Sequence, residues 1–383
     1  MAEIVTEVQI RAGAQEPARV ARAVAGAISH ALAPEDAPRL AAEPPAKSTR
    51  PDHRAETAYL QARFHLGKLS GEGIQRGLMH LQEAIALDPT HARAHAALAN
   101  CLVMLGYWGH APWQEAYRSA KQAALTAVEL DPGLCYGQVA LAFVRLLYDW
   151  DFDKAEGGVQ RAVRMGPSDE MAHLLSATYE SWIRDDQEAA LTSARTALAI
   201  DPISPYTNSN VAWVLMFARR YDEAAEQAQR TLQMYQDAHQ ALLVLAWARV
   251  ARGCVDEALT MFERAAAASP DPVTLGFLGH VQGRMGRETQ ARALLERLTA
   301  GSESTCPPVK SIVSVLTGLG ETDRAFEWLE RGLAVRDGGL LALRVSPPLE
   351  PLATDPRFDR LVERIGLKAA TRPACPTSPA RPT

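Results

Sequence analysis

The chain repeats one pattern of polar and apolar positions along most of its length. In each copy a loop is followed by an acidic or polar pair, an alanine, and then apolar residues three and four positions apart, as in RRYDEAAEQAQRTLQ and GCVDEALTMFERAAAASP. Apolar residues at this spacing line one face of an α-helix. Each copy therefore predicts an amphipathic helix whose apolar face includes the alanine.

The alanines of successive copies recur at nearly constant steps. They are Ala120, Ala155, Ala190, Ala224, Ala258, Ala291 and Ala325, separated by 35, 35, 34, 34, 33 and 34 residues. An earlier and looser copy has Gly77 at this position. We expect two helices to cross closely there, because a close crossing leaves no room for a large side chain. A step of about 34 residues is the length of a tetratricopeptide (TPR) unit, which is a helix, a tight turn, a second helix and a short link.

Further signals agree with this unit. Its first helix has a large residue followed by a small one, as in Leu245-Ala246 and Leu278-Gly279, and several second helices close on ALDP, ELDP or AIDP, where the proline ends the helix. The sequence predicts an all-α fold, a right-handed superhelical solenoid of about eight TPR-type repeats. We divide the chain into an N-terminal helical segment and linker (1–50), the solenoid (51–335), a C-terminal capping segment (336–368) and a disordered tail (369–383).

Three segments also resemble a known family. FVRLLYDWDFDKAE, AIDPISPYTNSNVAWVLMFARRYDEA and PLATDPRFDRLVERIGL resemble the C-terminal TPR module of bacterial multidomain signalling regulators, over roughly residues 55–367. In that family the module follows a winged-helix, nucleotide-cyclase or protein-kinase domain, often with a TolB-like segment between them. Only about 50 residues precede the repeats here, and ARVARAVAGAISHAL is similar to the joining helix of that family. The resemblance implies that this chain is the sensing or docking half of such a regulator and that the effector is a separate chain.

Charge and hydropathy narrow the class of partner. The 383 residues include 40 Lys and Arg and 45 Asp and Glu, a net charge of −5, whereas neutralising nucleic-acid phosphates needs a basic excess. The chain has no signal-peptide pattern at its start and no apolar run of about 18 residues. Its five cysteines are scattered, which fits reduced thiols in a cytosol. We therefore expect a cytoplasmic protein that binds neither nucleic acid nor membrane directly.

Three motifs resemble chemical sites, and each lacks an essential part. The glycines of SGEGIQRG have no preceding strand and no Walker lysine, so we interpret them as a loop between helices. His91 and His95 share a helical face but have no third ligand nearby in sequence. The alternating aspartates of YDWDFDKAE lack the glycine and terminal glutamate of a calcium loop and indicate a helix-turn-helix corner. With no catalytic motif such as G-x-S-x-G, we expect no enzyme activity, no metal and no cofactor.

One position of the first helices is mostly aromatic. This position comes directly after the small member of each large-small pair. Its residues are Asn100, Phe143, Tyr179, Trp213, Trp247 and His280, and Trp182 lies a turn beyond Tyr179. First helices line the concave side of such solenoids, and Tyr and Trp dominate binding hot spots. We therefore predict a concave aromatic face that binds a protein or peptide partner. Two alternatives stay open: the rings fill space between helices, or the groove binds a small molecule as a sensor or carrier.

Overall fold

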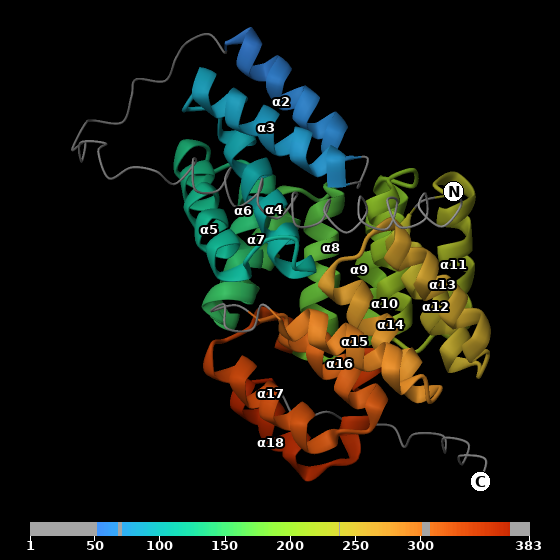
Figure 1. Cartoon of the computed structure of the whole chain (residues 1–383). Coiled ribbons are helices and arrows are strands. Elements are labelled where there is room, and N and C mark those ends of the chain that lie inside the picture. The colour runs from blue at the N-terminus through green and yellow to red at the C-terminus, as the bar shows by residue number, and fades with distance from the viewer. Residues whose placement is uncertain (1–51, 68–70, 237, 301–306, 368–383) are drawn as a thin grey trace.

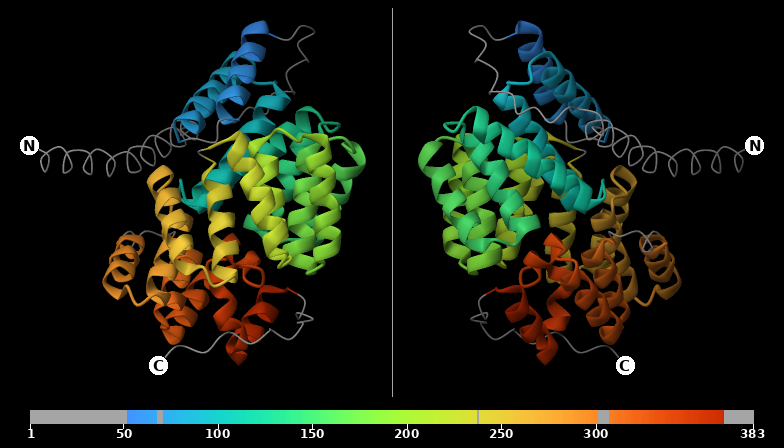
Figure 2. Two further views of the ribbon diagram at one scale, coloured as in Figure 1. Left: turned by 90° about the vertical axis from the view of Figure 1, so that its right-hand side faces the viewer. Right: turned by 90° about the vertical axis from the view of Figure 1, so that its left-hand side faces the viewer.

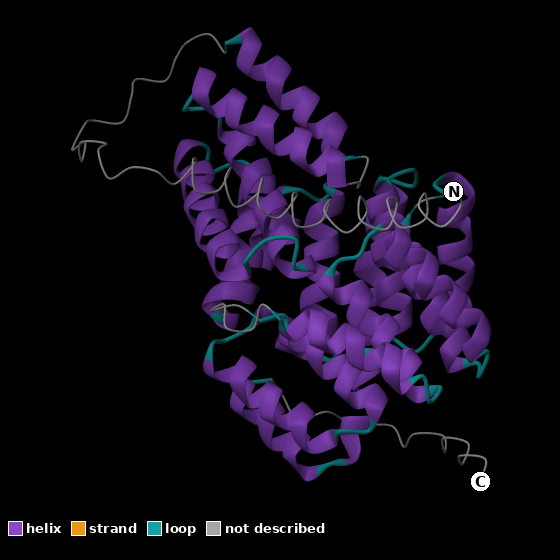
Figure 3. Cartoon of the chain, viewed as in Figure 1, coloured by secondary structure: helices purple, strands orange, loops and turns teal. Residues whose placement is uncertain are grey.

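The computed structural model describes residues 52–67, 71–236, 238–300 and 307–367. Every regular element within these ranges is helical (Figure 3). The predictions made for residues 1–50 and 369–383 lie outside the described residues. None of the helices in the described part of the chain combines the length and the apolar character that crossing a membrane requires.

Eight consecutive helix pairs make up the described solenoid. They are α2 (His53–Leu66) with α3 (Gly71–Leu87), α4 (Ala92–Trp108) with α5 (Trp113–Leu130), α6 (Cys135–Val144) with α7 (Phe152–Met165), α8 (Glu170–Tyr179) with α9 (Gln187–Ile200), α10 (Pro205–Phe217) with α11 (Tyr221–Met234), α12 (His239–Ala251) with α13 (Val255–Ala268), α14 (Pro272–Arg284) with α15 (Glu288–Thr299), and α16 (Val309–Leu319) with α17 (Thr322–Ala334). First helices pack on first helices, such as α4 on α6, α10 on α12 and α14 on α16. The pairs run from α2 and α3 at one end of the molecule to α17 at the other (Figures 1 and 2). The prediction of an all-α repeat solenoid is confirmed.

Small residues sit at the helix crossings, as the repeat pattern predicts. All seven recurring alanines are buried, and Ala258 has no exposed surface. A β-carbon on Gly77 would lie only 2.5 Å from Cγ of Leu66, so this early copy needs glycine where later copies use alanine. The interpretation of SGEGIQRG as a loop is wrong, because helix α3 begins at Gly71. The apolar spacing of Ile74, Leu78 and Leu81 continues the helix through the glycines.

Two π-helical turns account for the longer repeats. The third and fourth pairs contain η1 (Arg145–Asp149) and η2 (Glu180–Arg184), directly after α6 and α8. A π turn accommodates one extra residue in a helix, and these pairs lie in the two 35-residue steps of the pattern. Each turn ends on a left-handed residue other than glycine, Trp150 (φ 53°) or Asp185 (φ 59°). The first helix then turns into the second without disturbing the crossing.

The chain returns to these π turns after the last pair. Two 3₁₀ helices, η3 (Gly338–Ala342) and η4 (Pro347–Thr354), precede α18 (Pro356–Ile365); we call residues 338–354 the strap. A β-carbon on Gly338 would lie 2.5 Å from the carbonyl oxygen of Leu147 in η1. Arg344 donates hydrogen bonds to the carbonyl oxygens of Trp182 (2.8 Å) and Ile183 (3.1 Å) in η2. The strap therefore crosses the inner side of the curve.

Candidate binding cavity on the concave face

A cavity of about 90 Å³ lies inside the curve of the solenoid, lined by residues of α4, η2, α10, α14, α16 and the strap among others. Its aromatic lining residues are Tyr107, Trp108, Phe143, Trp182, Tyr206, Trp213, Phe217 and Phe277. Hydroxyl and amide groups, among them those of Ser181, Asn210, Gln240 and Ser346, complete the lining. An apolar cavity with a few convergent polar groups is the usual form of a ligand site.

Helix α10 contributes one continuous face to the cavity. Tyr206, Asn210, Trp213 and Phe217 line it at spacings of four, three and four residues, which place them on one side of the helix. The helix begins at Pro205, and Ser204 caps it by accepting a hydrogen bond from the amide of Thr207 (3.2 Å). The Trp213 and Phe217 rings stack with centroids 5.6 Å apart. This stacking fixes the wall of the cavity.

The π turn η2 positions Trp182 on the opposite wall. The Trp182 ring stacks on Tyr107 with centroids 5.5 Å apart and meets Phe217 edge to face at 6.4 Å. Arg344 binds the carbonyl oxygens at the C-terminal end of η2, where a cation is favoured by the helix dipole. The strap thus holds Trp182 in place and contributes Ser346 and Pro347 to the cavity lining.

Lys310 is the one charged residue among the described residues that line the cavity. Its side chain is buried, it donates a hydrogen bond to the Tyr107 hydroxyl (3.1 Å), and its Nζ lies 4.6 Å from the centroid of that ring. Within the described ranges no carboxylate forms an ion pair with Lys310. The indole N–H groups of Trp108 and Trp213 are buried and have no acceptor in the described part of the chain. The cavity lining therefore includes one ammonium group and two indole rings whose N–H groups have no acceptor among the described residues.

Three of the seven residues predicted as a binding face line this cavity, namely Phe143, Trp182 and Trp213. The other four lie between helices outside it. Asn100 donates to the carbonyl oxygens of Ala96 (3.0 Å) and Tyr136 (3.4 Å), so it links α4 to α6. The Tyr179 hydroxyl donates to the carbonyl oxygen of Phe152 (3.3 Å).

Trp247 and His280 belong to a second aromatic cluster. The Trp247 ring lies 5.3 Å from Phe262, 5.3 Å from Phe277 and 5.5 Å from His280, measured between centroids. His280 is 1% exposed, and its Nδ1 lies 3.0 Å from the carbonyl oxygen of Ser314 in α16. Burial lowers the pKa of His280 to about 4. The imidazole is thus neutral at pH 7 and donates this hydrogen bond.

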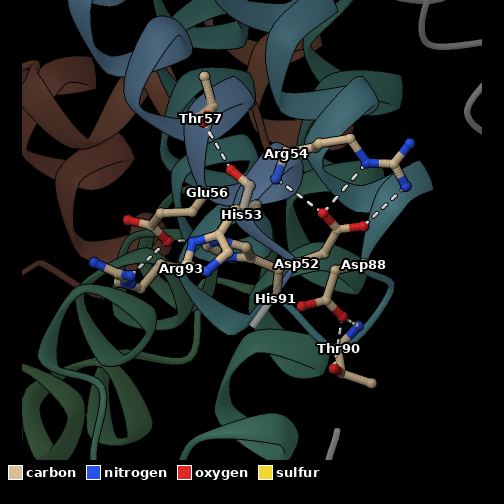
Figure 4. Close-up of polar contacts among 10 residues, drawn as sticks. Asp52, His53, Arg54, Glu56, Thr57, Asp88, Thr90, His91 and Arg93 are labelled. Atoms are coloured by element: carbon tan, nitrogen blue, oxygen red, sulfur yellow. Dashed lines mark hydrogen bonds and ion pairs between the residues drawn. The ribbon is translucent and has the colours of Figure 1, made fainter. Parts of the chain in front are cut away.

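The two histidines of HARAH stabilise the junction of the first two repeats. His91 caps α4 by accepting from the amide of Ala94 (3.1 Å), and its other ring nitrogen lies 3.1 Å from a carboxylate oxygen of Glu56 (Figure 4). Arg93 binds the same carboxylate at 2.7 Å. His95 Nε2 lies 3.0 Å from the carbonyl oxygen of Pro89. Across the described residues no three His, Cys, Asp or Glu side chains are grouped as metal ligands.

The aspartates of YDWDFDKAE form the expected corner between two helices. Asp151 caps α7 by accepting from the amide of Lys154 (3.1 Å). Asp149 ends η1 and forms an ion pair with Lys121 of α5 (2.7 Å). Their carboxylates are therefore used by the helix cap and by a contact between neighbouring pairs, and the prediction of a helix-turn-helix corner is confirmed.

Several lining residues were missed by the repeat register alone. Tyr206, Asn210 and Phe217 have a signal in the sequence, because they share the helical face of Trp213. Lys310 and Tyr107 have no such signal. They meet only because α16, the first helix of the eighth pair, approaches α4, the first helix of the second pair. The strap residues also lie outside the repeat pattern.

Comparison with known proteins agrees with the fold. Residues 212–272 match the family model described as tetratricopeptide repeat. A chain of the APC/C hetero-tetramer Cut9–Hcn1 is similar at 14% identity over 77% of this chain and 55% of that one, with a TM-score of 0.54. A monomeric mutant of IFIT1 with Gppp-AAAA is similar at 16% identity over 82% and 71%, with a TM-score of 0.52.

A thermophilic TPR protein of Thermus thermophilus is similar at 18% identity over 51% of this chain and 99% of that one, with a TM-score of 0.41. No curated protein matches the chain. The repeat spacing and the paired helices show an all-α repeat solenoid, and residues 212–272 within it are similar to the tetratricopeptide repeat.

Proposed function

We propose that this protein is a non-enzymatic binding module that holds an apolar, ring-bearing segment of a protein or peptide partner in the concave cavity. The observation that supports this function best is the convergence of aromatic walls from α4, η2, α10 and α14 on one cavity that Lys310 also lines. Aromatic side chains combine a large apolar area with few torsional freedoms, so they bind a partner at low entropic cost. The four predicted residues outside the cavity, Asn100, Tyr179, Trp247 and His280, contribute in this proposal by supporting its walls.

The wider biological role in this proposal follows from the family resemblance. The segments similar to bacterial signalling regulators support a cytoplasmic role in signalling or transcription regulation, with an effector domain on a separate chain as the partner. The proposed role involves no direct binding to nucleic acid or membrane, no metal and no cofactor.

A cavity-filling variant tests the proposed function. Asn210 is half-buried in the lining, and its amide donates a hydrogen bond to the carbonyl oxygen of Tyr206 on its own helix (2.9 Å). Asn210→Trp should fill the cavity without breaking a contact between helices. The matched control is Thr192→Trp, which adds the same ring on the exposed face of α9. Both proteins should keep the wild-type helical circular dichroism.

The readout is affinity capture from native cell extract, with retained proteins identified by mass spectrometry. A partner retained by wild type and by Thr192→Trp, and lost with Asn210→Trp, supports binding in the cavity. Equal retention by all three proteins contradicts the proposal for this cavity.

The enclosure of the cavity favours a second candidate function, a sensor or carrier of small molecules. The strap residues Ser346 and Pro347 cover a space of about 90 Å³, enough for roughly six to nine groups the size of a water molecule. A small molecule fits within this volume, whereas only a single side chain of a peptide would fit. A pool of small metabolites that raises the thermal midpoint of wild type and not of Asn210→Trp would support this candidate, because a ligand that binds only the folded state stabilises it.

A further inference from the structure

We infer that the cavity selects a ligand in which a carboxylate is attached to an apolar or aromatic body. This inference rests on the proposed function, binding in the cavity, and names the chemical class that the site recognises. Its source is either a small organic acid or a peptide with a free carboxylate, because both present the same group.

The first argument is the buried ammonium of Lys310. Its side chain is 8% exposed, and removing an ammonium from water costs several kcal/mol unless an anion and hydrogen-bond acceptors replace the solvent. The Tyr107 hydroxyl supplies one neutral contact at 3.1 Å. No carboxylate side chain lines the cavity among the described residues. A bound carboxylate would place a negative charge in direct contact with the ammonium.

Asp337 is the acidic group whose field reaches Lys310, and it is already engaged elsewhere. It begins the strap, and its carboxylate accepts a hydrogen bond from the amide of Gly339 (2.8 Å). Asp337 does not line the cavity and is not in ion-pair contact with Lys310. Burial raises the pKa of Asp337 to about 6, and Lys310 opposes this rise. Asp337 therefore contributes a negative charge near Lys310 without forming an ion pair with it.

The second argument is the indole N–H of Trp213. This donor is buried in the cavity wall, on a side chain that is 8% exposed, and it has no acceptor in the described part of the chain. A buried donor without a partner is unfavourable. A carboxylate has two oxygens and accepts about four hydrogen bonds, so a ligand bound by Lys310 has acceptors left for an indole N–H that turns toward it.

The walls determine the rest of the ligand. Trp182 and Phe217 offer ring faces and edges, and the volume of about 90 Å³ admits roughly six to nine non-hydrogen atoms. A six-membered ring fits within this volume, and phenylacetate, with its short acidic side chain, has ten non-hydrogen atoms, just above the upper end of this range. Phenylacetate is therefore the probe for the small-molecule source, and a tetrapeptide Ala-Ala-Ala-Phe with a free C-terminus is the probe for the peptide source.

The test is isothermal titration calorimetry on the full chain with each acid and with its neutral amide. We expect wild type to bind phenylacetate or the free-acid peptide at least about tenfold more tightly than the corresponding amide, since a charge-assisted hydrogen bond contributes about 1.5–3 kcal/mol. Lys310→Met should abolish this preference, and Lys310→Arg should largely restore it. Lys121→Met, which removes a partly exposed lysine paired with Asp149, should leave it unchanged.

The outcomes separate this inference from the proposed function. Preference for phenylacetate assigns the small-molecule source, and preference for the free-acid peptide assigns the peptide source. Equal binding of acid and amide that disappears in Asn210→Trp keeps the cavity as a binding site and overturns the carboxylate inference. Binding of neither acid also overturns it. Binding that persists in Asn210→Trp places the probe outside the cavity and contradicts both.

Discussion

The guanidinium of Arg344 donates a 2.8 Å hydrogen bond to the main-chain carbonyl oxygen of Trp182, although 162 residues separate the two. The bond joins the strap to the π turn that positions Trp182 against Tyr107. Because a helix end leaves its last carbonyl oxygens without partners inside the helix, this contact stabilises the turn and closes the cavity at once. It is the clearest link between the capping segment and the candidate binding site.

Replacing Arg344 should loosen the strap while leaving the repeats folded. Arg344→Met leaves the carbonyl oxygens of Trp182 and Ile183 without this donor, and we expect a loss of about 1–3 kcal/mol in unfolding free energy. Arg297→Met, at an exposed position on α15, is the control. Urea denaturation measures the loss, and hydrogen exchange should show faster exchange in residues 338–354. Unchanged protection of the strap would contradict this role.

The crossing of α14 and α16 should not tolerate a methyl group. A β-carbon on Gly318 would lie 2.6 Å from Cα of His280 and closer still to its carbonyl oxygen, so Gly318→Ala should cost about 1–3 kcal/mol or more through overpacking. Gly157, within α7, has open space around its α-carbon. Gly157→Ala should instead stabilise the protein by about 0.5–1 kcal/mol. Opposite shifts of the thermal midpoint check the pair, and a neutral Gly318→Ala would show that the two helices are farther apart.

His280 should make the fold sensitive to acid. Its pKa falls from 6.5 in the unfolded chain to about 4 when folded, because of burial, so the unfolded state binds more protons between these values. The stabilisation is complete above pH 6.5 and is lost as the pH falls toward 4, by about 3 kcal/mol at most. His280→Gln, which does not titrate, should lack this loss. Urea unfolding at a series of pH values measures it, and parallel curves for the two proteins would contradict the burial of a neutral imidazole.

Asp337 should have the opposite effect. Burial raises its pKa from 3.8 to about 6, so the folded state binds more protons in this range and stability falls as the pH rises from about 4 to 6. Asp337→Asn keeps an oxygen that can accept from Gly339 and removes the charge. We expect the variant to be more stable than wild type at pH 7, by about 3 kcal/mol at most, and equally stable near pH 3. A destabilised variant at pH 7 would mean that the charge of Asp337 is needed.

The fold could be predicted from the sequence because the same constraint recurs in every repeat. Ala120, Ala258 and Ala325 each occupy a crossing that excludes larger side chains, and their spacing determines the length of the unit. The two 35-residue steps contained the signal for the π turns. That signal was ambiguous, since an extra residue can also lengthen a loop.

The cavity could be predicted only in part. Phe143 and Trp213 share a register, Trp182 lies one turn beyond it, and a register is visible in a repeat sequence. The contact of Lys310 with Tyr107 spans 203 residues and depends on how far the solenoid curves, which results from the sum of many small rotations between repeats. The strap lies outside the repeat, so its position over the cavity had no sequence signal.

The most direct test of the binding cavity is the indole N–H spectrum of the protein labelled with ¹⁵N-tryptophan. The chain has seven tryptophans, and Trp213→Phe and Trp328→Phe identify two of their signals. Trp328 lies on α17 and does not line the cavity. If the cavity binds an acidic ring compound, the Trp213 signal should move and saturate as phenylacetate is added, while the Trp328 signal stays in place. A Trp213 signal that stays in place with an excess of phenylacetate and with an excess of the free-acid peptide would contradict the account.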